Sequence, residues 1–246
     1  MWNKICLLLV FFDFGSQQKL NYDFEEYKLE CDFVNLSGRF EIQIIFVLII
    51  FSIWFAYSYG CQAINLFVIT RDSRIDEILG EHKPKHNNKD VLTFYAFHSQ
   101  THFLPKLIGS NFMNLKTIMI TKSYLNLIEF RDFKNMKKLQ KLFLPANQIE
   151  KLSPCTFRYA ENLDLIDLSG NRIFFLQSDT FTYLLKLTKI FLALNNISKI
   201  EENFMTLTKI ETVDMKGNIC INACFGCING LNLRDFQNIS VTRCRN

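Results

Sequence analysis

Residues 139–147 read LQKLFLPAN, and a phrase of the same form occurs three more times downstream. It reads LDLIDLSGN at 163–171, LTKIFLALN at 187–195 and IETVDMKGN at 210–218. Each copy has apolar residues at its first, fourth and sixth positions and asparagine at its ninth. A period in the low twenties predicts a stack of equivalent coils that bury their apolar edges against one another. The asparagines Asn147, Asn171, Asn195 and Asn218 lie 24, 24 and 23 residues apart.

Two weaker copies precede these four. Residues 115–123 read LKTIMITKS and keep the apolar positions, with Ser123 in the place of asparagine. Residues 91–114 repeat only part of the pattern, with Ser99 at the turn position, and we interpret them as an irregular first coil. A phenylalanine also follows each phrase and is expected to close the back of its coil. These residues are Phe133, Phe157, Phe181 and Phe204.

Alternation along each expected strand indicates which side chains face the core. Successive side chains of a strand point to opposite faces, so Leu142 and Leu144 are expected inside and Lys141 and Phe143 outside. Asparagine suits the turn because its amide bonds nearby backbone groups and because it tolerates left-handed backbone. We expect the asparagines to form a ladder that satisfies buried backbone groups. Each such group would cost roughly 1–3 kcal/mol if it were left unpaired.

Over residues 115–220 the chain resembles the leucine-rich repeat family, whose coils each combine a strand with a return segment. The resemblance implies an α/β solenoid, a horseshoe with parallel strands on its concave face and disulfide-bearing end caps. It places the repeats at 91–219 and a C-terminal cap at 220–246. The short cap is also similar to that of small secreted insect leucine-rich repeat proteins, including some that are tied to innate immunity.

The N-terminus predicts export. An apolar run at 5–12 follows a single lysine, and residues 1–15 have the length of a signal peptide, although the cleavage pattern is poor. Residues 16–90 would then form an N-terminal cap and loop, with an exposed loop at 71–90. Export would give a secreted glycoprotein. Three glycosylation sequons begin at Asn35, Asn196 and Asn238.

Export also predicts oxidised cysteines. We expect Cys31 to pair with Cys61, and the resemblance to the family's cap implies a Cys220–Cys244 pair. Cys155, Cys224 and Cys227 are left without an assigned partner. The Cys-x-x-Cys motif at 224–227 has no second copy and no histidine downstream, which favours pairing within the cap or with Cys155 over zinc binding.

Residues 42–60 do not fit this plan. They form an uncharged run of 19 residues, long enough as a helix to cross a bilayer core of about 30 Å. A membrane helix would leave either the repeats or Cys31 and Asn35 in the cytosol, where disulfides do not persist. Three interpretations stay open. The segment is a real span of a single-pass membrane protein, an atypical insert or artefact such as a retained intron, or a buried core segment.

No familiar catalytic motif is present, neither a phosphate-binding glycine loop nor a Gly-x-Ser-x-Gly or His-Glu-x-x-His sequence. His82 and His86 are four residues apart, as are His98 and His102, but Pro84 disfavours a helix through the first pair. The net charge of +4 is too small and scattered to imply a nucleic-acid partner. We therefore expect no enzyme activity, no cofactor and no metal. An enzyme or metal protein with its site in the N-terminal third is the alternative.

The outward strand positions form rows across the coils, and these rows hold several large apolar residues. Aromatic side chains flanked by charge are typical of protein interfaces, whereas cross-strand packing that stiffens the sheet is the alternative explanation. We expect an extracellular protein that binds a protein or glycan through this concave sheet, in recognition or innate immunity. A membrane-anchored receptor or adhesion protein is the alternative. The predicted binding residues are Tyr95, Met119, Lys141, Phe143, Asp167, Lys189, Phe191 and Asp214.

Overall fold

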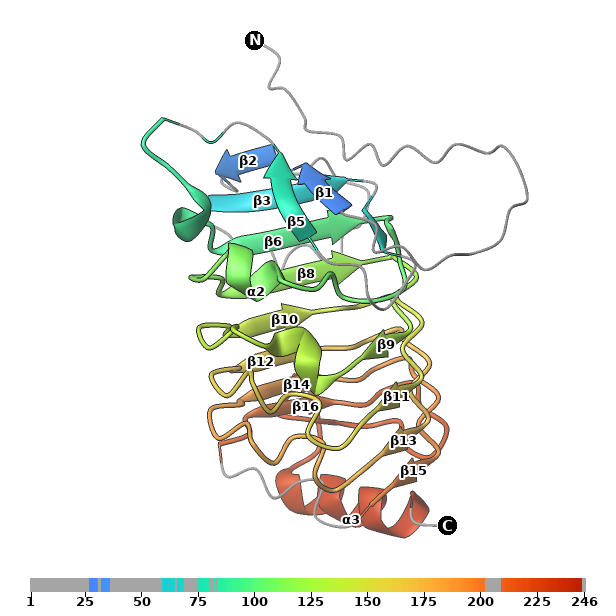
Figure 1. Ribbon diagram of the computed structural model, residues 1–246. Helices are drawn as coiled ribbons and strands as arrows, with labels where there is room; N and C mark the ends of the chain where they lie inside the picture. Colours follow the sequence, from blue (N-terminus) through green and yellow to red (C-terminus); the bar gives the residue numbers. More distant parts are fainter. Residues whose placement is uncertain are drawn as a thin grey trace, which may run out of the picture.

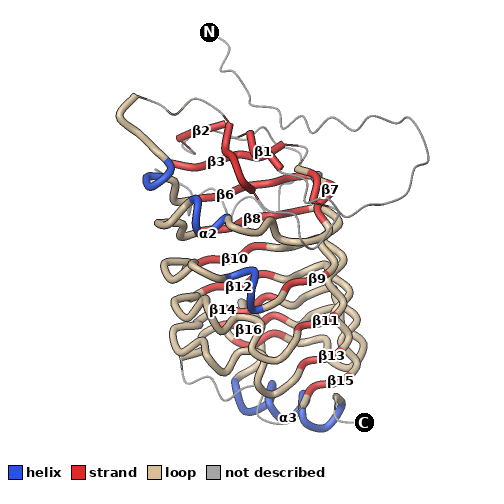
Figure 2. Tube along the Cα trace, viewed as in Figure 1, coloured by secondary structure: helices blue, strands red, loops and turns tan. Residues whose placement is uncertain are grey.

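The molecule is a stack of coils along one axis, with the strands of successive coils side by side (Figure 1). The computed structural model describes residues 27–30, 32–35, 59–64, 66–68, 75–79, 82, 84–201 and 209–244. One sheet runs the length of this part of the chain, and loops and short strands return each coil on the opposite side (Figure 2). The predicted solenoid architecture is confirmed.

The long sheet has nine strands among the described residues. Neighbours from β3 to β16 are parallel, whereas β2 and β17 pair antiparallel at the two ends. Parallel pairing follows from the repeat, because every coil returns the chain to the same end of the sheet before the next strand begins. In order, the strands are β2 (Asp32–Asn35), β3 (Tyr59–Ile64), β6 (Thr93–Phe97), β8 (Thr117–Thr121), β10 (Lys141–Phe143), β12 (Leu165–Asp167), β14 (Lys189–Phe191), β16 (Thr212–Asp214) and β17 (Cys224–Phe225).

The return side contains little regular structure. Two-residue strands pair there between neighbouring coils, and the helices are short. The strands are β4 (Phe67–Val68), β7 (Gln100–Thr101), β9 (Leu127–Ile128), β11 (Lys151–Leu152), β13 (Phe175–Leu176) and β15 (Lys199–Ile200). The helices are the 3-10 turns Asn88–Asp90 and Phe130–Phe133 and the α-helix α2 (Ile108–Asn111).

The core lies between the long sheet and the return side. Leu142, Leu144 and their counterparts in the other phrases are fully buried, as the alternation predicted. A column of phenylalanines fills the back of the coils. The ring centroids of Phe133 and Phe157 are 5.6 Å apart, and those of Phe157 and Phe181 are also 5.6 Å apart. Buried aromatic rings in contact contribute apolar area to the packing of neighbouring coils.

The asparagine ladder joins each coil to the one before it. Asn171 accepts a hydrogen bond from the backbone N–H of Ile149 and donates to the carbonyl oxygen of Leu144, both in the preceding coil. Asn195 and Asn218 repeat these bonds one and two coils later. Upstream, the Oδ1 of Asn147 accepts from the N–H of Ser123, whose Oγ accepts in turn from the N–H of Ser99. Serine therefore continues the ladder where asparagine is absent.

Caps cover both ends of the sheet. At the C-terminus, Cys220 and Cys244 form a disulfide, as expected, and helix α3 (Leu233–Arg243) buries Phe236 against the last coil. At the N-terminus, β2 pairs with β3, placing Phe33 opposite Cys61. Cys61 is disulfide-bonded, but Cys31, its predicted partner, lies outside the described residues.

The N-terminal third contains strands that the sequence did not reveal. Residues 71–90 are not simply an exposed loop, because β5 (Ile75–Leu79) pairs there with β1 (Tyr27–Glu30) and a 3-10 turn follows. The long sheet also begins earlier than residue 91, since β3 pairs in parallel with β6. Neither strand belongs to the 24-residue pattern, so periodicity gave no signal for them.

The predicted signal peptide at 1–15 and residues 42–58 of the hydrophobic run lie outside the described residues. The last two residues of that run, Tyr59 and Gly60, are buried at the start of β3. Within the part of the chain that the structure covers, no helix combines the length and the apolar character that a membrane span requires.

Candidate binding surface on the concave sheet

The predicted binding residues lie in rows across the concave face because the repeat places equivalent positions side by side. Phe143 pairs with Asp167, which pairs with Phe191, which pairs with Asp214. Tyr95 and Met119 continue this middle row toward the N-terminus. A second row runs beside it and contains Lys141, Leu165, Lys189 and Thr212. The structure thus brings together all eight residues that the register pointed to.

The aromatic part of this face is more buried than the sequence suggested. Met119, Phe143 and Leu165 have exposed fractions of only 9%, 5% and 6%, and they form an apolar cluster separate from the main core. Tyr95 and Phe191 are partly buried and pack against its edges. The expectation of exposed anchors is therefore wrong for Phe143 and Met119. Adjacent strands lie only about 4.8 Å apart, so large side chains on neighbouring strands cover one another.

Tyr95 combines an apolar contact with a polar one. Burial raises the pKa of its phenol to about 12, and a hydrogen bond with the Thr121 side chain opposes that rise. Tyr95 is therefore neutral at physiological pH and presents a hydroxyl group at the N-terminal edge of the apolar cluster.

Two lysines of the concave face share one carboxylate. Burial raises the pKa of Asp164, while the charges of Lys141 and Lys189 act in the opposite direction. Burial also lowers the pKa of Lys141, and Asp164 opposes that change. Among the described atoms, Asp164 Oδ1 is buried without a hydrogen-bond partner. The two lysines therefore compensate Asp164 through their electrostatic field.

Asp167 and Asp214 lie in the middle row, one on each side of Phe191. The Oδ1 of Asp167 accepts from the N–H of Ser169 at 2.9 Å, and that of Asp214 accepts from the N–H of Lys216 at 3.0 Å. Burial raises the pKa of Asp167, and the negative charge of Asp214 raises it further, while bonds from Ser169 lower it. The carboxylate of Asp214 therefore acts electrostatically on that of Asp167, with Phe191 on the strand between them.

Asp214 also lies beside a disulfide. Strand β17 places Cys224 opposite Asp214, and Cys224 is bonded to Cys227 within the cap. One carboxylate oxygen and the two sulfur atoms all lie within 4.8 Å of one another. The sequence offers no sign of this grouping, because only the antiparallel pairing of the cap with the last repeat brings Asp214 to the cysteines.

A family model described as leucine rich repeat matches residues 113–173 and 161–219. Residues 113–219 of the chain are leucine-rich repeats. No curated protein sequence matches the chain. Among solved structures, the crystal structure of a TLR13–ssRNA13 complex is similar, with a TM-score of 0.52 and 22% identity over 64% of this chain and 25% of that chain. Another is the structure of the Toll–Spatzle complex, a hub in Drosophila development and innate immunity, with a TM-score of 0.48 and 14% identity over 64% and 27%.

These likenesses concern the fold alone. The match spans about a quarter of the TLR13 and Toll chains, so this leucine-rich repeat protein corresponds to a small part of their length. The similarity to secreted insect proteins, which the sequence analysis drew from the cap, stays a prediction.

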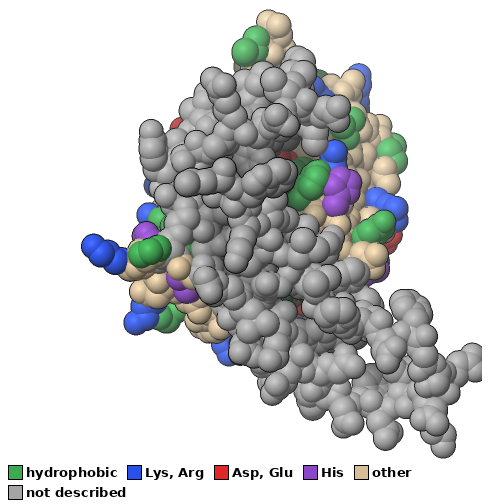
Figure 3. Space-filling model, turned by 90° about the horizontal axis from the view of Figure 1, so that it is seen from above, with side chains coloured by type: hydrophobic (Ala, Val, Ile, Leu, Met, Phe, Trp, Pro, Cys, Tyr) green, Lys and Arg blue, Asp and Glu red, His purple; other side chains and the backbone are tan. Residues whose placement is uncertain are grey.

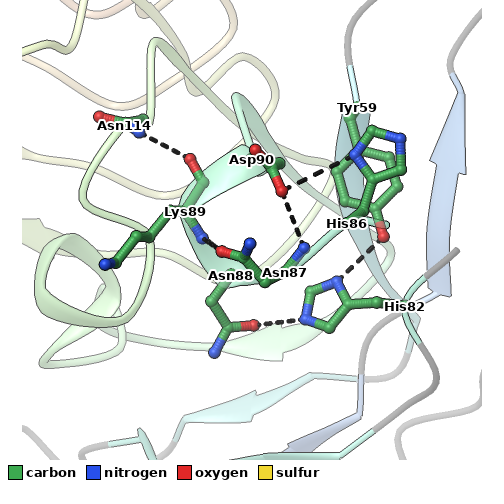
Figure 4. A network of polar contacts seen from close by, with 8 residues as sticks. All are labelled: Tyr59, His82, His86, Asn87, Asn88, Lys89, Asp90 and Asn114. Carbon is green, nitrogen blue, oxygen red and sulfur yellow. Dashed lines mark hydrogen bonds and ion pairs between the residues drawn. The ribbon is translucent and has the colours of Figure 1, made fainter. Parts of the chain in front are cut away.

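All four histidines of the leucine-rich repeat protein lie between residues 82 and 102, and histidine side chains are visible at its N-terminal end (Figure 3). His82 lies between Tyr59 and Asn88, with Nδ1 3.0 Å from the tyrosine hydroxyl and Nε2 2.8 Å from the amide oxygen (Figure 4). An imidazole protonated on Nε2 fits both contacts, since it donates to Asn88 and accepts from Tyr59. His86 stacks on the Tyr59 ring at 4.2 Å. This pair therefore joins strand β3 to the segment that precedes β6.

The second histidine pair makes separate contacts. His98 packs edge-on against Phe97. His102 lies 3.3 Å from the Asn126 side chain and stacks on Tyr124.

The predicted modification sites differ in their surroundings. Asn196 is exposed at a turn directly after the ladder residue Asn195, whereas Asn238 is exposed within helix α3. Asn35 ends strand β2, and its side chain lies outside the described structure. Cys155 is a free, partly buried thiol. Glycosylation at the three asparagines stays a prediction.

Proposed function

We propose that this leucine-rich repeat protein is an extracellular binding module that recognises a protein or glycan through its concave sheet and performs no chemistry of its own. The observation that carries the proposal is the second apolar cluster. Met119, Phe143 and Leu165 lie on the sheet face opposite the core and form an apolar cluster apart from the side chains that the coils enclose. An aromatic surface edged by charged groups is the composition of an interface centre.

The arrangement of polarity supports the same proposal. Tyr95 and Phe191 remain partly accessible at the two ends of the cluster, and Lys141, Lys189, Asp167 and Asp214 lie around it. An apolar centre with a charged surround excludes water in the middle and selects partners at the edge. Innate immune recognition is one setting for such a module.

Affinity capture from the extracellular fluid of the source organism tests the proposal. The immobilised wild-type chain is compared with Phe191→Asp, which places a charge at the edge of the cluster, and with Leu185→Asp. Leu185 is 73% exposed and lies outside the concave strands, so it controls for added charge. Partners retained by Leu185→Asp and lost by Phe191→Asp support the proposal. Equal recovery by all three proteins refutes it.

Nucleic acid is not part of this proposal, but the fold does not argue against it. The similar TLR13 structure is a complex with ssRNA. The case against nucleic acid therefore rests only on the small net charge of +4. An ssRNA arm in the capture experiment, with recovery measured at two salt concentrations, tests that expectation directly.

A membrane-anchored receptor or adhesion protein is the second candidate, and the uncharged run at 42–60 favours it. Sodium carbonate extraction of cells that express the full chain separates the two proposals. Retention in the membrane pellet favours an anchored protein, whereas release into the supernatant or the medium favours a secreted one.

A further inference from the structure

Three residues near the C-terminal end of the concave face form a symmetric row. Asp167 on β12, Phe191 on β14 and Asp214 on β16 are direct cross-strand neighbours, with the ring between the two carboxylates. Neighbouring strands lie about 4.8 Å apart, so the two aspartate backbones are separated by roughly 10 Å. A partner side chain placed over the ring would therefore lie between the two carboxylates.

The carboxylates are held by the backbone. Each carboxylate accepts a hydrogen bond from the backbone N–H two residues later. Ser169 donates to Asp167, and Lys216 donates to Asp214. A carboxylate fixed in this way needs little reordering when a partner binds, which lowers the entropic cost of binding.

Lys141 and Lys189 of the concave face interact electrostatically with Asp164, which is not part of this row. The charged residue that acts on Asp167 is Asp214, which has the same sign. Within the described part of the chain, neither carboxylate forms an ion pair with a lysine or arginine. Two like charges near each other on a partly buried surface favour the arrival of a cation.

The ring between them suits the same ligand. Elsewhere in this protein aromatic rings already carry a cation, as Lys151 lies over Phe174 and Lys199 over Phe175. No comparable contact to Phe191 occurs among the residues that the structure describes. An ammonium or guanidinium group over an aromatic face gains cation–π attraction, and flanking carboxylates add charge-assisted hydrogen bonds.

We propose that Asp167, Phe191 and Asp214 form a subsite for a lysine or arginine side chain of a protein partner. The inference rests on the proposed concave-face function and narrows its ligand to a protein with a basic segment. A sulfated or otherwise acidic glycan is repelled by the same two carboxylates.

The test uses the full chain and a capped peptide of alternating glycine and lysine, with glutamate and norleucine versions as controls. Titration calorimetry and the ring resonances of Phe191 in NMR spectra report binding and its location. The lysine peptide is expected to bind and to shift the Phe191 signals, while the other two do not. Asp167→Asn and Asp214→Asn should each weaken binding about tenfold, and Phe191→Leu should weaken it about threefold.

Glu161→Gln provides the matched control, because it removes the same charge from an exposed position outside the concave strands. It should leave the affinity within about twofold of wild type. Equal losses in Glu161→Gln and the aspartate variants would mean that net charge alone attracts the peptide, and this would overturn the subsite. Unaltered affinity in both aspartate variants would overturn it as well.

The subsite and the proposed function can be refuted independently of each other. If Phe191→Asp abolishes partner capture while the aspartate variants bind the lysine peptide like wild type, the concave face stands and the subsite is refuted. If the peptide binds at Asp167 and Asp214 while capture by Phe191→Asp is undiminished, the subsite stands and the concave-face function is refuted.

Discussion

The side chain of Asn171 holds the backbone of Ile149 in the preceding coil, accepting the Ile149 N–H at 3.0 Å. The same amide group donates to the carbonyl oxygens of Leu144 and Leu168, each at 2.9 Å. A longer bond reaches the carbonyl oxygen of Ser169 at 3.4 Å, so the buried Asn171 bonds four backbone groups in two coils. A short polar side chain at this turn therefore works as a staple between successive repeats.

Asn171→Ala is expected to lower the free energy of unfolding by about 2–4 kcal/mol, because it leaves buried N–H and C=O groups without partners. Urea denaturation followed by circular dichroism measures the change. Asn126→Ala is the control, since Asn126 is exposed and its side chain lies beside His102 at the surface. The control should change the stability by less than about 1 kcal/mol. Equal effects would show that the ladder bonds contribute no more than a surface contact.

The disulfide of the C-terminal cap offers a second test. Cys220 and Cys244 close a loop of sequence separation 24. Replacing both by serine should lower the free energy of unfolding by roughly 2–4 kcal/mol, because the unfolded chain gains freedom. Cys155→Ser should change it little, because Cys155 is a free thiol. Denaturation of the three oxidised proteins side by side gives the comparison, and an unaffected double variant would contradict the structural role of the bridge.

The repeats could be read from the sequence because one period governs both faces of the sheet. Leu142 and Phe143 are adjacent in sequence, and alternation assigns them to opposite faces, as the structure confirms. Alternation does not say how deeply an outward side chain is covered. The burial of Phe143 depends on Met119 and Leu165 in neighbouring strands, and that dependence is visible only in three dimensions.

The ends of the molecule were harder to predict for a related reason. Strand β5 pairs with β1, about fifty residues away, without a repeated pattern to mark either strand. Asp214 meets Cys224 only because the chain reverses direction after the last repeat. In both caps the strand pairing depends on how the chain folds back outside the repeats. The repeat period gives no information about that part of the chain.

The turn enclosed by the Cys224–Cys227 disulfide should not tolerate a side chain at Gly226. Gly226 has a φ of +72°, and a Cβ there would lie 1.8 Å from the carbonyl oxygen of Glu211. Gly226→Ala is therefore expected to destabilise the cap by more than about 3 kcal/mol, since backbone must move to relieve the overlap. Limited proteolysis of the C-terminal segment and urea denaturation report the loss.

Gly170→Ala measures the free-energy cost of a positive φ without the steric overlap that is expected at Gly226. Gly170 has a similar φ of +66°, but the nearest atom to an added Cβ lies at 3.4 Å. Only the left-handed backbone penalises alanine there, at about 1–2 kcal/mol. If both variants lose the same stability, the close approach of Gly226 to Glu211 has no energetic consequence.

The acid pair of the concave face predicts a dependence of stability on pH. Burial and the charge of Asp214 raise the pKa of Asp167 in the folded protein above its value in the unfolded chain. The folded state therefore holds this proton more tightly, and the stability that the group contributes is lost as the pH rises through the folded pKa. Asp167→Asn cannot ionise, so it should have a higher Tm than wild type at pH 7.

The advantage of Asp167→Asn should shrink as the pH falls toward about 4, because the wild-type carboxyl becomes protonated first in the folded state and, below about 4, in the unfolded chain as well. Thermal unfolding of both proteins between pH 4 and pH 8 measures it, and Glu161→Gln again controls for the removal of one surface charge. A Tm difference that is independent of pH would sink the explanation by ionisation. A variant more stable at pH 7 than the native protein would mean that Asp167 is retained at a cost to folding, as binding residues commonly are.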